Sequence, residues 1–264
     1  MQENLELRLR TRQETTPGSG KFALIEQSVV WDVRQTALIL CDVWNAHWCR
    51  SATARVAELA PALNNVVERA RDLGVFVVHA PSDTLDYYRE APQRRLAQAA
   101  LAEFPGGPQR WYPLDPTREP PLPIDDSDDG CDDTPPCPTG NPWTRQHPAI
   151  RIAPEDAISD NGAEVDALFR QRNIANVLVA GVHTNMCVLG RSFGIRSMVQ
   201  TGRKVALMRD MTDTMYNPQS PPFVSHFQGT DLVVAHIETW WCPSFLSTDL
   251  TDAAPFRFRE NKEM

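Results

Sequence analysis

The sequence predicts an α/β protein with a doubly wound three-layer α/β/α fold, in which helices cover both faces of a mostly parallel central sheet. Short apolar runs without charged residues, such as 37–41 and 177–180, are typical of strands buried on both faces. These runs alternate with amphipathic helical patterns, as in a parallel sheet with crossover helices. A chain of 264 residues, 42% of them hydrophobic, is long enough for one such domain with additions.

We expect two parts, an N-terminal hairpin extension at residues 1–35 and a main domain at 36–264. Residues 5–12 alternate apolar and polar side chains, and a Pro-Gly turn separates them from a second strand at 22–33. This β-hairpin is expected to cover a sheet edge or to meet a partner subunit.

The main domain is expected to contain alternating strands and helices. Helix 51–73 has one apolar face, and Gly74 lies just beyond its end, which is a common helix stop. The expected strands are 36–41, 75–79, 149–153, 177–180, 205–208 and 232–237. The expected helices are 51–73, 87–104, 162–172, a segment that begins after Cys187, and 218–227.

Residues 105–148 are predicted to form a long irregular insertion on the surface. This stretch holds 12 of the 22 prolines and a cluster of six aspartates between 125 and 133, and it shows no periodicity. The insertion is either a solvated excursion without function or the rim of a pocket.

The overall charge and the cysteines exclude several classes of protein. A formal net charge of −8 argues against a general nucleic-acid or anionic-membrane surface.

The first residues lack the basic and apolar regions of a signal peptide, so we expect a cytoplasmic protein. Six scattered cysteines do not form a disulfide framework. Cys131 and Cys137 could pair or share a metal, but no second ligand pair follows at metal spacing, so no metal or cofactor is predicted.

Two residues with chemical potential follow buried strands of the predicted sheet. Asp42 closes strand 36–41, where it could be a turn or cap residue or an acid/base group. Cys187 lies where strand 177–180 leads, through Gly181, into a helix. The positive end of a helix favours a thiolate, so Cys187 is a candidate nucleophile, although a small buried residue is the alternative.

The residues around these two positions resemble a known family. The run Ala37-Leu38-Ile39-Leu40-Cys41-Asp42-Val43, with Asn45, resembles the first-strand motif of the isochorismatase-like cysteine hydrolases. The octapeptide Gly181-Val182-His183-Thr184-Asn185-Met186-Cys187-Val188 resembles their nucleophile motif and is the more specific of the two. The resemblance covers about residues 36–238.

The resemblance implies a hydrolase that cleaves a C–N bond of a small amide, carbamoyl or ureido compound through a thioester. Asp42 would be the acid/base and Cys187 the nucleophile. A cis peptide bond would join Val182 and His183. It would aim the backbone N–H groups of His183 and Cys187 into one oxyanion hole. The family also suggests a dimer or tetramer, with a small molecule as the substrate.

The family uses a lysine beside the Asp and Cys, and the sequence lacks it at the matching place, around residues 149–156. The nearest cation there is Arg151, which could supply the positive charge but cannot carry a proton, and which could equally face solvent. His183 or His79 could supply a titratable group instead. Two alternatives therefore stay open: a catalytically idle protein that binds a small molecule or acts as an assembly unit, and a hydrolase for vinyl ethers.

The pocket walls are expected to come from Trp44, Asn45, His47 and His79. His47 could be a metal ligand, but the sequence shows no partner set for it, so a packed or hydrogen-bonded histidine is the simpler interpretation.

Overall fold

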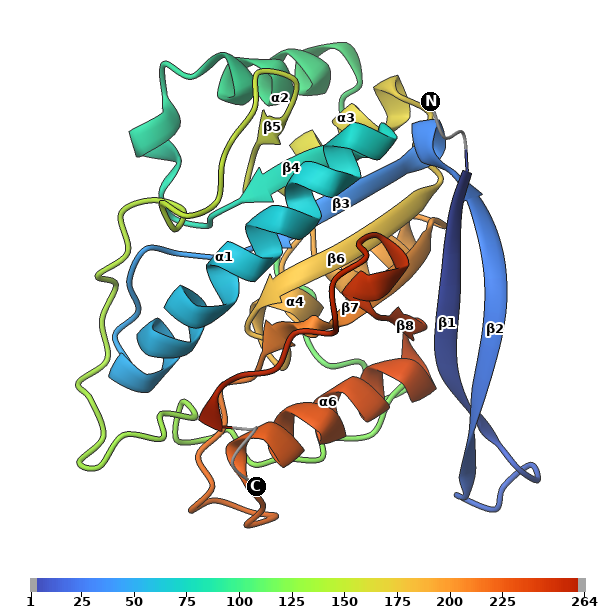
Figure 1. Cartoon of the computed structure of the whole chain (residues 1–264), viewed down its shortest axis with the longest axis vertical. Coiled ribbons are helices and arrows are strands. Elements are labelled where there is room, and N and C mark those ends of the chain that lie inside the picture. Colours follow the sequence, from blue (N-terminus) through green and yellow to red (C-terminus); the bar gives the residue numbers. More distant parts are fainter. Residues whose placement is uncertain (1–3, 261–264) are drawn as a thin grey trace.

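The computed structural model describes residues 4–260, which form an α/β fold around an eight-stranded sheet (Figure 1). Residues 1–3, on which the expectation about a signal peptide partly rests, lie outside this range. The strand order is β2-β1-β8-β7-β6-β3-β4-β5, and all neighbours from β8 to β5 are parallel. The strands are β1 (Asn4–Glu14), β2 (Phe22–Asp32), β3 (Thr36–Cys41), β4 (Phe76–Ala80), β5 (Ala157–Ile158), β6 (Asn176–Val182), β7 (Lys204–Asp213) and β8 (Ser244–Phe245).

Helices cover both faces of the sheet, as predicted. The α-helices are α1 (Arg50–Leu73), α2 (Pro92–Glu103), α3 (Gly162–Gln171), α4 (Cys187–Gly190), α5 (Ile195–Gln200) and α6 (His226–Trp240), with 3-10 turns η1 (Val33–Gln35), η2 (Leu85–Tyr88) and η3 (Ser247–Asp249). Alternate residues of β3 enter two separate cores, Leu38 and Leu40 packing with α1 and Ile39 with α2 and α3. The two cores bury both faces of β3, so its sequence is apolar throughout.

The N-terminal segment forms the expected hairpin. β1 and β2 pair antiparallel along their whole length, and Arg10 of β1 pairs with Ser244 of β8. Leu5, Leu7 and Leu9 point from β1 into the core shared with α1. The hairpin therefore covers the edge of the very short strand β8, and it stands at one side of the molecule in Figure 1.

Three elements expected from the sequence are wrong. Residues 232–237 belong to helix α6, because an apolar run of this length fits a buried helix segment as well as a strand. Ser225 and Gln228 form a capping box that fixes the start of α6, so no helix spans 218–227. Residues 149–153 are irregular, and the edge strand at this place is β5 instead.

The strand that leads toward Cys187 continues through Gly181 to Val182. Gly181 has φ 111°, and a Cβ atom there would lie 2.1 Å from the carbonyl oxygen of Cys41. Only glycine permits this close approach of β6 to β3. The helical pattern after Cys187 is divided into α4 and α5, which begins after Gly194.

The order in which strands are added to the sheet reverses between β3 and β6. From β3 it continues to β4 and β5 on one side, whereas β6, β7 and β8 follow on the other side. The carboxyl ends of β3 and β6 therefore flank a topological switch point, which is where open α/β sheets bind ligands.

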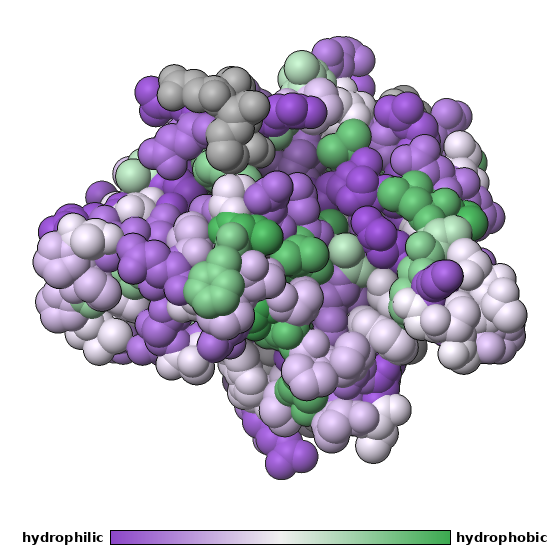
Figure 2. Space-filling model, turned by 90° about the horizontal axis from the view of Figure 1, so that it is seen from below, coloured by the Kyte–Doolittle hydropathy of each residue, from purple (hydrophilic) through white to green (hydrophobic). Residues whose placement is uncertain are grey.

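The insertion at 105–148 is irregular as predicted but is not simply solvated. Glu119, Ile124, Cys131 and Gln146 are buried, and Gln146 forms an isolated bridge with Trp44. On the face shown in Figure 2, hydrophilic residues separate the hydrophobic ones into small groups. No helix in the described range 4–260 has the length and apolar character required to span a membrane.

Candidate active site

Asp42, Cys187 and Arg191 form one contact group at the switch point. Asp42 follows β3 with φ 49° and is fully buried, and its Oδ1 accepts a hydrogen bond of 2.7 Å from the N–H of Ser82. Its Oδ2 accepts one of 3.1 Å from Nε of Arg191. The thiol of Cys187, at the start of α4, is close enough to Asp42 for the two groups to interact. The structure thus brings the predicted nucleophile and the predicted acid/base together.

The electrostatics of this group keep the thiol protonated at rest. Burial, followed by the Asp42 charge, raises the pKa of Cys187, and the Arg191 charge opposes the rise. Burial also raises the pKa of Asp42, again against Arg191. The expectation that the helix end favours the thiolate is therefore wrong. Helix α4 has only four residues, and the sulfur is buried beside a carboxylate.

Arg191, and not Arg151, is the cation of the site. The Arg151 side chain is 67% exposed, and its Nη1 lies 3.9 Å from Oε1 of Glu68. This corrects the assignment of Arg151 in place of the family lysine. Arg191 lies four residues after Cys187, so both side chains project from the same side of one helical turn. That spacing is visible in the sequence and is the signal that could have identified Arg191.

Stacked rings lie near the loop that leads to Cys187. Trp44 stacks on Trp143 of the insertion at 4.4 Å between ring centroids, and His47 stacks on Trp143 at 5.6 Å. The edge of His183 meets His47 at 4.9 Å. Two buried ring nitrogens, Nε2 of His183 and Nε1 of Trp143, find no hydrogen-bond partner among residues 4–260. Trp143 was not predicted, because nothing in an irregular segment indicates its direction.

His47 and His183 are both held in the neutral form. Burial lowers the pKa of His47 to about 4, and the Arg55 charge acts in the same direction. Burial also lowers the pKa of His183 well below its usual range. The peptide bond between Val182 and His183 is cis, as the resemblance implies.

The two other predicted pocket residues have structural partners. Asn45 accepts hydrogen bonds from the N–H groups of Thr144 and Arg145, so it fastens the end of the insertion. His79 is fully buried between Gln146 and Asp156, with both ring nitrogens engaged at 2.9 Å. His79 is therefore not a substitute for the missing lysine.

The insertion also closes over α4. The ring of Trp111 lies 2.3 Å from where a Cβ atom of Gly190 would be, and the N–H of Tyr112 donates to the Gly190 carbonyl at 2.6 Å. Cys187 is 8% exposed and the Arg191 side chain 25%, so the guanidinium is the more accessible member of the group.

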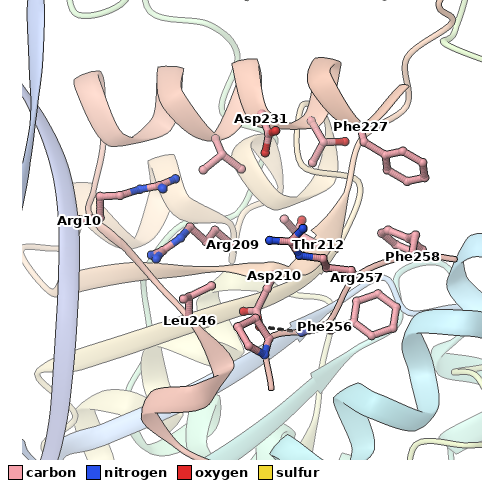
Figure 3. A pocket seen from close by; sticks show the side chains of 13 residues that line it. Arg10, Arg209, Asp210, Thr212, Phe227, Asp231, Leu246, Phe256, Arg257 and Phe258 are labelled. Carbon is pink, nitrogen blue, oxygen red and sulfur yellow. Dashed lines mark hydrogen bonds between the residues drawn. The ribbon is translucent and has the colours of Figure 1, made fainter. Parts of the chain in front are cut away.

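A separate cavity of about 450 Å³ lies between α6, β7 and the C-terminal segment (Figure 3). Arg10, Arg209 and Arg257 line it together with Asp210 and aromatic rings of the C-terminal segment. Its walls do not include Asp42, Cys187 or Arg191.

No protein-family model matches the sequence, and no curated protein matches it. Solved structures match the fold. A cysteine hydrolase from Pseudomonas syringae pv. phaseolicola has 16% identity and a TM-score of 0.51, with 85% of this chain and 96% of that chain covered. An isochorismatase from Pseudomonas putida KT2440 has 10% identity and a TM-score of 0.50, with 82% of this chain and 90% of that chain covered. The predicted resemblance is thus confirmed at the level of the fold.

Proposed function

We propose that the protein is a cysteine-dependent hydrolase that cleaves a C–N bond of a small amide, carbamoyl or ureido compound. The single observation that supports this most strongly is the contact of Asp42 with both Cys187 and Arg191 at the switch point. The fold shared with a cysteine hydrolase structure is consistent with the proposal.

In this proposal Cys187 attacks the carbonyl carbon while Asp42 takes the thiol proton. The tetrahedral oxyanion is held by backbone N–H groups, for which those of His183 and Cys187 are the candidates. The proton then passes from Asp42 to the leaving nitrogen, the C–N bond breaks, and a thioester remains on Cys187. Water attacks the thioester with Asp42 as the base, which releases the acid and restores the thiol.

Arg191 acts as a fixed positive charge. A guanidinium stays protonated in proteins, so it stabilises the Asp42 carboxylate and the developing thiolate but moves no proton. All proton transfer is therefore assigned to Asp42.

The proposal is tested by release of ammonia or amine from a panel of small amides, carbamoyl and ureido compounds under reducing conditions. We expect turnover by the native protein and its loss in Cys187→Ser. The matched control is Cys242→Ser, which changes a buried thiol on the far side of β7 and should keep the activity. Full turnover by Cys187→Ser would contradict the assignment of the nucleophile.

Replacing Arg191 by glutamine should move the acidic limb of the pH–kcat/KM profile to higher pH. The carboxylate form of Asp42 is the active base, and Arg191 lowers the pKa of that carboxyl. Without the cation the pKa rises further, by about 1 to 3 units for a charge at this distance. Arg191→Lys keeps the charge and should stay near the native profile. An unchanged limb in Arg191→Gln would show that Arg191 does not act on the base.

A second candidate function is binding of a small molecule without turnover. The replacement of a titratable amine by a guanidinium and the burial of Cys187 favour it. A compound of the panel that raises Tm but is not hydrolysed would support this function. Cys187-dependent turnover of any compound would exclude it.

We also propose that the chain forms a homo-oligomer through the hairpin. β2 is the outer strand of the sheet and exposes Leu24, Ile25 and Val30. Light scattering at micromolar concentration should give at least a dimer, and a monomer would contradict the expectation.

A further inference from the structure

Three cysteines and one carboxylate gather beside the start of α1. Cys49 immediately precedes α1, whereas Cys131, Asp133 and Cys137 belong to the insertion, which passes close to this helix end (Figure 1). The sulfurs of Cys49 and Cys131 and a carboxylate oxygen of Asp133 all lie within 4.8 Å of one another. Two segments far apart in the sequence therefore supply one compact set of soft and hard ligand atoms.

The distances from Asp133 to Cys49 and Cys131 are close to those between ligands of one metal ion. Its Oδ2 lies 3.4 Å from Sγ of Cys49, 3.7 Å from Sγ of Cys131 and 3.2 Å from Sγ of Cys137. In a tetrahedral zinc site, with Zn–S of about 2.3 Å and Zn–O of about 2.0–2.2 Å, sulfur and oxygen ligands lie about 3.5 Å apart. The distances to Cys49 and Cys131 are therefore close to those between ligands of one zinc ion, whereas Cys137 lies outside the group whose ligand atoms are all within 4.8 Å of one another.

The surroundings hold these groups in place. Cys49 and Cys131 are buried in a small apolar cluster with Ala52 and Met215. The N–H and the hydroxyl of Ser51 donate to the two oxygens of Asp133 at 3.1 and 3.0 Å. Hydrogen bonds of this kind orient a ligating carboxylate. Without a metal ion, the three thiols would share one carboxylate oxygen as their acceptor. Thiols are weak hydrogen-bond donors, so these contacts would stabilise the cluster little.

We propose that Cys49, Cys131 and Asp133 bind one Zn²⁺ ion, which joins the insertion to the start of α1, with Cys137 beside them. A ligand set with two thiolates favours zinc over magnesium or calcium. The ion would link two segments that are far apart in the sequence, so we assign it a structural role. The proposal is independent of the hydrolase activity, and it revises the expectation that the protein holds no metal.

The metal would stabilise the segment that also carries Trp143. Asp132, between two of the ligands, pairs with Arg55 of α1 at 2.7 Å, so zinc and this ion pair would hold the same stretch of the insertion. Removing zinc should loosen residues 105–148 and make them a preferred site of proteolysis.

The first test measures the zinc content of the purified, dialysed protein by elemental mass spectrometry. We expect about one zinc ion per chain in the native protein, as for a structural site of this type. Cys49→Ser and Cys131→Ser should lose most of it. Cys187→Ser and Cys242→Ser, which change cysteines outside the cluster, should retain it. Because Cys187→Ser removes the proposed hydrolysis but not the zinc, the failure of one proposal is distinguishable from the failure of the other.

A second measurement does not depend on the folding of variants. Native protein stripped of zinc with a chelator is titrated with Co²⁺, which should give thiolate-to-cobalt absorption in the near ultraviolet and the visible bands of a tetrahedral site. Zinc should displace the cobalt and raise Tm. The proposal would be overturned if the native protein binds neither metal. It would also be overturned if zinc stays bound in both Cys49→Ser and Cys131→Ser, or if two of the three cysteines form a disulfide in the native protein.

Discussion

The Asp42→Asn variant is expected to lower kcat/KM by about 10²- to 10⁴-fold, the usual contribution of a general acid/base. The amide can still accept a hydrogen bond from the N–H of Ser82, but it cannot take the proton of Cys187. The measurement is the pH–kcat/KM profile of the variant with the best substrate of the panel. Any residual kcat/KM of the variant should lack the acidic limb that the titration of Asp42 gives the native profile.

The matched control for this variant is Asp83→Asn. Asp83 is the other carboxylate near Arg191, at 3.4 Å, but its side chain is 57% exposed. Its removal should change the activity little, because an exposed ion pair contributes little. Equal losses in the two variants, with unchanged Tm, would show that Asp42 acts only as a partner of Arg191 and not as the acid/base.

The Glu119→Gln variant is expected to lower the free energy of unfolding by about 3–5 kcal/mol, as for breaking a buried ion pair. Glu119 is buried in the insertion, where its carboxylate lies 2.7 Å from Nε of Arg196 and accepts from Nε2 of His236 and Nε1 of Trp241 at 2.7 Å each. The neutral amide would leave Arg196 buried without its counter-charge. Urea unfolding measures the loss.

The stability that Glu119 supplies should also depend on pH. Burial alone would raise its pKa, but the bonds from His236, Arg196 and Trp241 lower it from 4.5 to about 2. Because the pKa is lower in the folded state, this stability is present above about pH 4.5 and is lost as the pH falls toward 2. The native protein and Glu119→Gln should therefore converge in stability over that interval.

The control for Glu119→Gln is Glu155→Gln, which changes an exposed carboxylate and should alter the stability by less than about 0.5 kcal/mol. Equal stability of the two variants at neutral pH would contradict the role of Glu119 in fastening the insertion to α5 and α6.

The sheet centre could be predicted from the sequence because its strands are buried on both faces. β3 and β6 read as uninterrupted apolar runs, and Asp42 and Cys187 follow them at the ends that meet in space. The same signal failed at 232–237, where a buried helix gives a run just as apolar as a strand. Short edge strands such as β5 carry too few residues for any pattern.

The site was only partly predictable for a different reason. Arg191 follows Cys187 at helical spacing, which is a signal present in the sequence, whereas Arg151, the cation nearest the expected place of the lysine, is exposed. Trp143 and the approach of Cys49 to Asp133 depend on the path of an irregular insertion. Such a path is set by tertiary contacts, which leave no periodic trace in the sequence.

The proposed hydrolysis requires that Cys187 forms a covalent thioester. The most direct measurement is acid quenching of the native protein during turnover, followed by mass spectrometry of its peptides. We expect the peptide containing Cys187 to gain the mass of the substrate's acyl group, and Cys187→Ser to show no such gain under the same conditions. Turnover with the acyl group on a different residue, or with Cys187 never modified, would contradict it.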